Sequence, residues 1–519
     1  MSSVALPLPT DQLRPSDQLL ECSESFADTI LPLFGVGPVL VVGGAADCLT
    51  ATLRRRRIAT ARLDVTGPTA LPFGDGAFRT VIVWHALEHA RPEALDAIAR
   101  ELHRVSARYL FARVRTKHSS GAAPLATAWS RQHWEDCLLR AGFMRHPLSF
   151  DATPYETLED EGPEIVLTFE RLPIGLDHRF SLAELKVERN LHMDMLRESG
   201  RRADAHIARY HLAAQFIRPG DRVLDAACGL GYGSAILHDA SQASSVTGLD
   251  NSPFAIDYCR SECGAHRPRA SFVCGDITEL ERHGAGSADV VVSFETMEHI
   301  KDPEAFVSNV SRLLTPGGRL ICSVPNLWVD ETGSDPNPYH LHVFDRDKLV
   351  AVCGKYLRVE QLFGQTAGNG FKQSEQRRRM TPVALSDREA DPEWWVLVAV
   401  KPAAPDPRDA QISALTRALL RFAIADPRGI VVFGAGQGGR NAIARLRSLG
   451  AHVSGVVDNR EVTWGTEVDR VRVASPARLR SQLFAMIVIA SSVGHDEISR
   501  QLTEMGFVAS DHFIGLNDL

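Results

Sequence analysis

The chain lacks the features that would place it outside a cell or across a membrane. Its first residues, MSSVALPLPTDQLRPSD, contain no basic segment leading into an apolar core, which a secretory signal requires. No stretch approaches the ~18 consecutive apolar residues of a transmembrane helix. The nine cysteines form no CxxC pair, so neither a zinc set nor a disulfide framework is indicated. We therefore expect a cytoplasmic protein with reduced thiols and no membrane span.

The chain also lacks an excess of positive charge. Its formal net charge is -7, whereas binding to nucleic-acid phosphates usually needs a basic face. Two short basic runs, residues 54–57 and 377–379, are the exceptions, and such runs are usually solvated helix ends or loops. We expect no nucleic-acid partner. The sequence leaves a homo-oligomer open.

The length and the hydrophobic pattern indicate several α/β domains. At 519 residues the chain is long enough for about three domains of roughly 100–200 residues each. Apolar runs alternate with helix-like periodicity throughout, including one long charged helical pattern over residues 182–215. A proline-rich linker at 401–409 and a softer boundary near 172–177 divide the chain. We expect three Rossmann-like units, at residues 1–175, 176–403 and 410–519.

The middle segment contains the most informative motif, VLDAACGLGYGS at residues 223–234. An apolar strand ends at Asp225 and leads into a turn with Gly229 and Gly231, which opens a helix. Glycines suit this turn because the backbone must bend tightly and let a ligand lie against it. In doubly wound sheets the ligand binds beyond the carboxyl ends of the strands, where this turn lies.

Acidic residues end the next three strands of the same segment. Asp250 follows Gly231 by 19 residues, and a carboxylate there can accept hydrogen bonds from both hydroxyls of a ribose. Asp276 ends the third strand, where an acid could receive an adenine amino group, and Glu295 ends the fourth. Four successive strand ends with plausible ligand contacts indicate one nucleoside-type site.

The motifs VLDAACGLGYGS, GLDNS, FVCGDI, VVVSFETMEHI and LLTPGGRLICSVPN together resemble the class I S-adenosylmethionine (SAM) dependent methyltransferases, particularly the branch that modifies glycans and small molecules. The resemblance covers roughly residues 209–401 and implies a seven-stranded sheet with SAM as cofactor. It also implies ligand contacts, with the methionine part on Asp225, Gly229 and Gly231, the ribose on Asp250 and Asn251, the adenine on Asp276 and Ile277, and the methyl-donor end near Glu295.

An NAD enzyme is the natural competitor, because it shares the first glycine turn. Asp225 argues against it, since a dinucleotide site usually has an apolar residue there. The PGGRLI turn and the closing strand WWVLVAV also fit a methyltransferase sheet, which ends in an antiparallel pair.

The chemistry requires orientation of the acceptor and activation of its nucleophile. The sulfonium of SAM already activates the methyl group, so alignment supplies much of the rate. A sugar hydroxyl has a high pKa, so its methylation also needs a base or a metal. His340 is the expected base and His299 the other candidate, although either can instead be a capping or packing residue. We expect no metal, because His340 and His342 form an i, i+2 pair without an evident third ligand.

The phrases SVPN and NPYHLHVF resemble bacterial methyltransferases of polysaccharide and O-antigen biosynthesis. We therefore expect methylation of a small molecule, a sugar or glycan intermediate of surface polysaccharide biosynthesis. Two alternatives stay open. One is O- or N-methylation of another small metabolite, and the other is a non-catalytic scaffold that binds SAM or a nucleotide.

The first segment repeats part of the middle one. VIVWHALEHA at residues 81–90 matches VSFETMEHI at 292–300, and a helix that opens with proline follows both. Its first turn has Val41 or Val42 where the acid should be, and only about 20 residues lead from that turn to Asp64, so a strand–helix unit is shortened. We expect a degenerate methyltransferase-like domain that binds SAM poorly, if at all.

The third segment contains a complete GxGxxG at Gly434, Gly436 and Gly439. Asp458 follows Gly439 by 19 residues, a spacing that fits a nucleotide-type Rossmann half. The segment resembles small Rossmann-like domains appended to sugar-modifying enzymes and methyltransferases. Its ligand would be a nucleotide or nucleotide-sugar, unless it is a structural module with an empty pocket.

Overall fold

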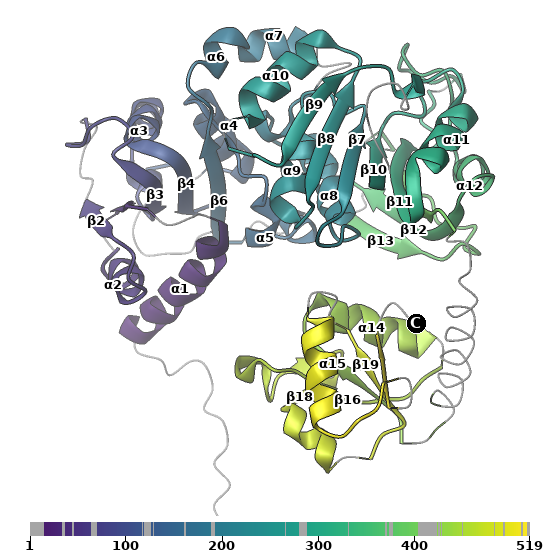
Figure 1. The fold of residues 1–519 in the computed structure, drawn as a ribbon. Helices are drawn as coiled ribbons and strands as arrows, with labels where there is room; N and C mark the ends of the chain where they lie inside the picture. Colours follow the sequence, from purple (N-terminus) through teal and green to yellow (C-terminus); the bar gives the residue numbers. More distant parts are fainter. Residues whose placement is uncertain are drawn as a thin grey trace, which may run out of the picture. The chain divides into compact units, whose positions relative to one another are not determined.

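The computed structural model describes residues 15–33, 37–43, 46–63, 70–116, 118, 126–127, 129–159, 162–187, 193–264, 266–279, 288–330, 332–368, 371–372, 377–402, 423, 426, 428–448, 450–481, 483–490, 494–509 and 512–515. None of the helices formed by these residues has the length and apolar character needed to cross a membrane. The chain divides into two compact units, residues 1–402 and 403–519 (Figure 1). Asp64 and most of the predicted linker, residues 403–409, lie outside the described residues.

The first sheet has six strands in the order β2-β1-β3-β4-β6-β5. The first four of these are mutually parallel, and β6 and β5 close the sheet as antiparallel strands. The strands are β1 (Val39–Val42), β2 (Thr60–Leu63), β3 (Phe78–Trp84), β4 (Ser106–Arg115), β5 (Phe143–Arg145) and β6 (Glu164–Arg171). The helices are α1 (Pro15–Ile30), α2 (Asp47–Arg55), α3 (Pro92–Val105), α4 (Arg131–Arg140) and α5 (Ser149–Ala152).

The central sheet has eight strands in the order β13-β12-β14-β11-β10-β7-β8-β9. Five adjacent strands, from β9 to β11, are parallel, and β14, β12 and β13 are antiparallel to their neighbours. The strands are β7 (Arg222–Ala226), β8 (Ser245–Asp250), β9 (Ala270–Cys274), β10 (Ala288–Phe294), β11 (Leu314–Pro325), β12 (Arg358–Thr366), β13 (Arg379–Val383) and β14 (Trp394–Val400). The expectation of seven strands was one short, because β13 adds an outer edge to β12.

Each of the six strands of the first sheet has a counterpart in the central sheet. The order β2-β1-β3-β4-β6-β5 corresponds to β8-β7-β10-β11-β14-β12 in direction and position. No described strand of the first sheet corresponds to β9 or to the added β13. This agrees with the short segment predicted between its first turn and Asp64.

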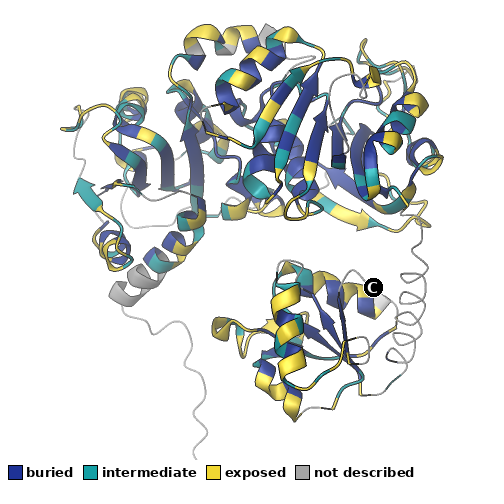
Figure 2. Ribbon diagram, in the orientation of Figure 1, coloured by how far each residue is buried: buried dark blue, intermediate teal, exposed yellow. Residues whose placement is uncertain are grey.

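Helices cover both faces of the central sheet. Side chains of α8, α9 and α10 form one core with β7, β10 and β14, and side chains of α11 and α12 form the other. The helices are α8 (Arg201–Ala214), α9 (Tyr232–Ala240), α10 (Pro253–Cys263), α11 (Pro303–Leu313) and α12 (Arg346–Gly354). The inner strands β7, β10, β11 and β14 are almost wholly buried (Figure 2), as expected for strands covered on both faces.

The first two sheets share one core. Met144, Phe150 and Tyr155 belong to the same buried cluster as side chains of α8 and α9. A buried ion-pair network also joins them, since the Arg267 guanidinium lies 3.0 Å from Glu170 of β6 and 2.9 Å from Asp239 of α9. The predicted boundary between residues 175 and 176 stays a prediction.

The predicted helical pattern over residues 182–215 is not one helix. It begins as α7 (Leu182–Val187), which follows the short α6 (Leu176–Arg179), and ends as α8. Gly200 stands just before α8 with φ 91°, a positive value that favours glycine and that the interior of a helix does not allow. The two basic runs are paired, since Arg56 contacts Glu24 and Asp28 while Arg378 contacts Glu159 and Asp204.

The third sheet has the order β17-β18-β16-β15-β19-β20, in which all strands except β17 are parallel. The strands are β15 (Ile430–Phe433), β16 (Val453–Val457), β17 (Glu467–Val468), β18 (Val471–Ala474), β19 (Met486–Ile489) and β20 (Phe513–Gly515). Its helices include α14 (Gln437–Ser448), which follows the glycine motif, and α15 (His495–Glu504). The α/β class and the three predominantly parallel sheets were correctly predicted.

Candidate functional site

Asp250 ties the end of β8 to the glycine turn after β7. One carboxylate oxygen accepts a hydrogen bond from the Gly229 amide at 2.9 Å, and the other accepts one from the Ser252 amide at 2.9 Å. The residue is 6% exposed, and each oxygen keeps a lone pair for a further donor. The predicted strand end therefore lies against the predicted turn.

The turn leaves open space where a ligand could lie. Gly229 has φ 54° and Gly231 has φ 77°, both in the left-handed region. A Cβ at Gly229 would meet no atom within 4 Å, whereas one at Gly231 would lie 2.7 Å from the Cys259 Sγ. Gly231 is needed for packing, and Gly229 faces open space.

Asp225 lies beneath this turn, fully buried at the end of β7. Its carboxylate accepts hydrogen bonds from the Ser234 hydroxyl at 2.7 Å and the Tyr210 hydroxyl at 3.1 Å. Burial raises the pKa of Asp225 to about 6, against the lowering effect of these two hydroxyls. The carboxylate thus orients the start of α9 and a tyrosine of α8.

The remaining residues predicted to contact the adenosine lie at the ends of β8 and β9. Asn251 and Asp276 are exposed, and Ile277 is 9% exposed. One oxygen of Asp276 accepts hydrogen bonds from the amide and the hydroxyl of Thr278, both at 2.8 Å. Asp250 and Asp276 therefore stand on neighbouring strand ends, with the amide of Gly275 donating to the Asp250 carbonyl at 2.9 Å.

Glu295 follows β10 in a left-handed conformation, with φ 52°. Its carboxylate lies 2.6 Å from the Arg209 guanidinium and accepts hydrogen bonds from the Ser323 hydroxyl and the Trp394 indole, both at 2.8 Å. Arg209 is completely buried in α8 and also packs over the Trp394 ring. Sequence reasoning missed both Arg209 and Trp394, because no spacing pairs them with Glu295.

Glu298, His299 and His340 meet beside this carboxylate. One potential ligand atom from each residue lies within 4.8 Å of the others, and the two histidine rings are 4.6 Å apart. The predicted candidates His299 and His340 are thus brought together, and Glu298 joins them. His342 points elsewhere, since its Nε2 lies 3.2 Å from the Lys301 carbonyl, and the segment is a turn and not the strand that an i, i+2 pair would need.

Three aromatic side chains line the same region. Trp328 stacks on Phe371 at 5.2 Å, Phe371 meets the edge of Trp394 at 5.0 Å, and Trp328 lies 5.4 Å from the His340 ring. These rings, the aromatic cluster, join the Glu295 carboxylate to the two histidines. Aromatic walls with a few convergent polar groups are typical of small-molecule sites.

The first sheet keeps the backbone of this region and changes its side chains. His85 follows β3 with φ 48°, as Glu295 follows β10 with φ 52°. Strand register places Val41 of β1 where β7 has Asp225. Glu88 is fully buried like Glu298, but it accepts a hydrogen bond from the Arg115 amide at 3.3 Å and lies 3.2 Å from the His85 ring.

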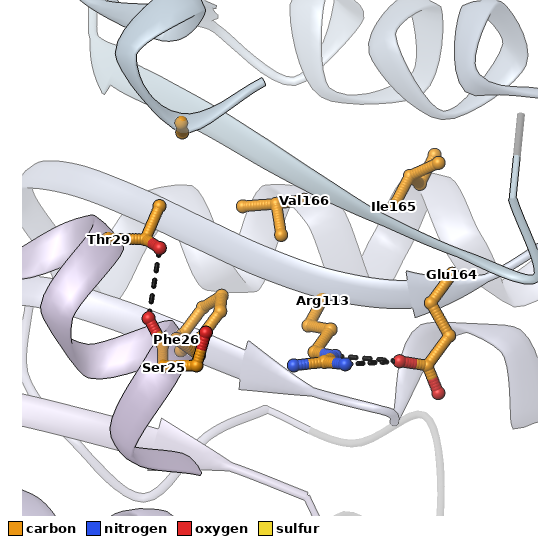
Figure 3. Close-up of a pocket in the computed structure, with 8 residues that line it drawn as sticks. Ser25, Phe26, Thr29, Arg113, Glu164, Ile165 and Val166 are labelled. Atoms are coloured by element: carbon orange, nitrogen blue, oxygen red, sulfur yellow. Dashed lines mark hydrogen bonds and ion pairs between the residues drawn. The ribbon is translucent and has the colours of Figure 1, made fainter. Parts of the chain in front are cut away.

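A cavity of about 140 Å³ lies at the corresponding end of the first sheet (Figure 3). Arg113 and Glu164 line it and pair with each other at 2.6 Å, and Ser25 and Phe26 of α1 line it from the other side (Figure 3). Here the guanidinium comes from β4 and the carboxylate from β6, whereas Arg209 belongs to α8 and Glu295 follows β10, so this cavity does not reproduce the arrangement around Glu295.

In the third sheet, Asp458 lies against the glycine motif, as its spacing in the sequence predicts. An oxygen of the Asp458 carboxylate accepts a hydrogen bond from the Ala435 amide, within the glycine motif, at 2.6 Å. The other oxygen accepts one from the Arg460 amide at 2.8 Å. A Cβ at Gly438 or Gly439 would lie 2.1 Å or 2.0 Å from a backbone oxygen, so close packing of the turn requires both glycines.

Comparison with known proteins gives matches in the central and last parts of the chain. Residues 224–322 match a family model described as "Methyltransferase domain", and residues 427–513 match one described as "C2185-like, N-terminal". A probable S-adenosylmethionine-dependent methyltransferase of Mycolicibacterium smegmatis is 35% identical over 163 residues, which are 30% of this chain and 60% of that protein. A ubiquinone biosynthesis O-methyltransferase of Coxiella burnetii is 32% identical over 116 residues, 22% of this chain and 48% of that protein.

Among solved structures, phosphoethanolamine N-methyltransferase 2 of Haemonchus contortus in complex with S-adenosyl-L-methionine is 14% identical, covering 74% of this chain and 99% of that chain with a TM-score of 0.30. The chain spans only 60% and 48% of the two curated relatives above. The match over residues 224–322 covers β7 to β11, the strands that carry the glycine turn, Asp250 and Glu295. The central part of this chain, around residues 224–322, is therefore similar to SAM-dependent methyltransferases.

Proposed function

We propose that the protein transfers a methyl group from SAM to a hydroxyl of a sugar or glycan intermediate, in the cytoplasm and in the biosynthesis of a surface polysaccharide. The observation that carries the proposal is the aromatic cluster, which joins Glu295 to the pair His299 and His340. Such a site offers flat apolar walls for a sugar ring and polar groups that could activate its hydroxyl.

The residues around the glycine turn fit SAM. Asp250 would accept hydrogen bonds from the ribose, with Asn251 beside it, while Asp276 and Ile277 would hold the adenine. The open space at Gly229 would receive the methionine part, and Asp225 would support that loop from beneath. When bound, SAM supplies a methyl group already activated by its sulfonium.

Glu295 and Arg209 would bound the space between the SAM site and the acceptor. Their ion pair fixes the position of the Glu295 carboxylate, so this group would already be oriented when an acceptor binds. The cluster of Glu298, His299 and His340 would activate the acceptor hydroxyl. Burial lowers the pKa of His299, which keeps its ring neutral near pH 7 and able to accept a proton or a ligand.

A second candidate is O-methylation of a phenol. The name of the Coxiella burnetii relative supports it, and an aromatic acceptor would also stack on Trp328 and Phe371. A non-catalytic scaffold is disfavoured by the intact glycine turn and by Asp225, which Val41 replaces in the first sheet.

The test is a turnover screen that measures S-adenosylhomocysteine formed with nucleotide-sugars, oligosaccharides, catechols and amines. We expect turnover with sugar hydroxyls, and we expect Trp328→Ala to raise the KM for the acceptor without changing SAM affinity. Val329→Ala, on the adjacent exposed position, is the matched control. Turnover only with catechols or amines would show that the acceptor is not a sugar. SAM binding without any turnover would favour a non-catalytic scaffold.

We also propose that the last domain binds a nucleotide or nucleotide-sugar through Asp458 and the glycine motif. The hydrogen bond between Asp458 and the Ala435 amide supports this, because it places a carboxylate beside the turn as in nucleotide-binding halves. Calorimetry of the full chain with UDP-sugars, ATP and NAD tests it. We expect binding that Asp458→Ala abolishes.

A further inference from the structure

Glu298 presents a carboxylate that the protein does not satisfy. The residue is 1% exposed, and neither carboxylate oxygen has a hydrogen-bond donor among the described residues. Burying an unpaired polar group costs several kcal/mol, and native proteins keep few such groups without a purpose. Arg209, the nearest buried cation named above, is already held by Glu295.

Two imidazoles face this carboxylate in defined orientations. The Nδ1 of His299 lies 3.0 Å from the Tyr339 carbonyl, which fixes its proton there and leaves the Nε2 lone pair free to coordinate. The Nδ1–H of His340 donates to an Asp335 carboxylate oxygen at 2.7 Å. The Asn337 side-chain amide donates to the His340 Nε2 at 3.0 Å, and a metal ion on Nε2 would displace this hydrogen bond. A carboxylate behind a histidine is the usual outer partner of a metal ligand.

The backbone holds the three side chains together. The amides of Leu341 and His342 donate to the Glu298 carbonyl at 2.7 Å and 3.2 Å. The segment that carries His340 is therefore attached to the turn that carries Glu298 and His299, although the two are distant in the sequence. Since the ligand atoms already lie within 4.8 Å of one another, only a small contraction would bring them into one coordination sphere.

We propose that Glu298, His299 and His340 bind a divalent transition-metal ion of the zinc, cobalt and manganese class. One carboxylate and two imidazoles form a ligand set known for catalytic zinc, and they leave coordination positions open for a substrate oxygen. Imidazole ligands favour these ions over magnesium and calcium. No metal was expected from the sequence because a third ligand was missing; Glu298 supplies it, and His299 takes the place considered for His342.

The position suggests the role of the ion, and this part rests on the proposed function. The site lies against Trp328 of the aromatic cluster, which extends from His340 to Glu295, and the acceptor hydroxyl would stand there. A bound divalent ion lowers the pKa of a coordinated hydroxyl and orients it. His299 and His340 would then act as ligands, and the ion would make the hydroxyl acidic enough to lose its proton to water.

The test is metal binding to the full chain, without SAM or acceptor. Chelator-treated protein is titrated with Co²⁺ alone and followed by visible absorption and calorimetry. We expect one Co²⁺ to bind per chain. Its visible absorption spectrum should be that of Co²⁺ coordinated by nitrogen and oxygen ligands. Glu298→Gln and His340→Ala should each weaken binding by about 10- to 100-fold or more, since even outer-partner substitutions cost that much.

Two matched variants serve as controls. His342→Ala changes a histidine of the same segment outside the cluster, and Glu88→Gln changes the corresponding glutamate of the first sheet, so both should bind Co²⁺ normally. Absence of stoichiometric binding, or binding that survives in both Glu298→Gln and His340→Ala, would overturn the site. Displacement of Co²⁺ by equimolar Mg²⁺ would overturn the choice of ion. The titration measures metal binding and not turnover. The metal site can therefore be confirmed or rejected even if the proposed methylation is not found.

Discussion

The Arg209 guanidinium and the Glu295 carboxylate form an ion pair of 2.6 Å that joins the helix before the first central strand to the end of the fourth. Arg209 is completely buried, while the Glu295 side chain retains 18% exposure. One side of the Glu295 carboxylate thus faces the buried Arg209 guanidinium, and the other side borders the candidate acceptor site.

Arg209→Met should destabilise the protein by up to about 3 kcal/mol, the low end for loss of one partner of a buried pair, because Glu295 keeps two hydrogen-bond donors and some contact with water. Adding Glu295→Gln should recover part of the loss, as expected when the remaining unpaired charge causes it. Urea unfolding measures both changes. Arg218→Met, at an exposed position after the same helix, should change the free energy of unfolding little, and an equal effect there would contradict the prediction.

The stability of the central domain should fall as the pH rises from about 4 to about 6, in part because of Asp225. Burial raises the pKa of this carboxyl to about 6 in the folded protein, above its value of about 3.9 in the unfolded chain. The unfolded chain therefore loses its proton first, and stability declines by up to about 3 kcal/mol over that range. In Asp225→Asn this contribution should disappear, so unfolding measured at pH 4.5 and 7.5 should differ less than in the parent. Parallel pH profiles for the two proteins would rule it out.

Arg267→Met should loosen both sheets of the first unit together. The guanidinium is 1% exposed and lies about 3 Å from three carboxylates, those of Glu170, Asp239 and Glu262. Removing it leaves buried negative charges facing one another, which costs about 3–5 kcal/mol. Hydrogen exchange should show lost protection in both β6 and α9. Arg179→Met, which breaks an exposed pair with Asp257, should cost no more than about 1 kcal/mol, and loss confined to one sheet would refute the coupling.

Calorimetry should find one SAM site per chain, in the central domain. The first sheet has Val41 in the place of Asp225 and His85 in the place of Glu295, so two of the four strand-end acids are replaced. Asp250→Ala should weaken SAM binding at least about tenfold, since it removes the predicted ribose partner and the acceptor of the Gly229 amide. Asp257→Ala, on the exposed face of α10, is the control. Two equivalents of SAM bound per chain would show that the first sheet also binds.

Features that depend on a short stretch of residues could be predicted from the sequence. The glycine turn, the strand ends at Asp225, Asp250 and Glu295, and the repeat in the first segment all arise within short windows. Strand β13 was missed because it lies at the sheet edge, where its short sequence RMTPV is mostly exposed and contains a proline. The partners Arg209 and Trp394 were missed for another reason, since only the fold brings α8 and β14 against Glu295. The role of Glu298 could not be predicted from the sequence either. It is indicated by the lack of hydrogen-bond donors to its buried carboxylate among the described residues, which only the structure shows.

The left-handed bends at His85 and Glu295 are evidence about ancestry. Selection for catalysis could explain the bend beside a working site, but the first sheet has Val41 for Asp225 and His85 for Glu295 and still keeps the backbone angle. A tandem gene duplication explains both, with the older geometry preserved because it directs a buried glutamate, Glu88 or Glu298, into the core that follows. The first sheet would then have changed from a second enzyme into a scaffold for its copy, and homologues with a single sheet should represent the form that preceded the duplication.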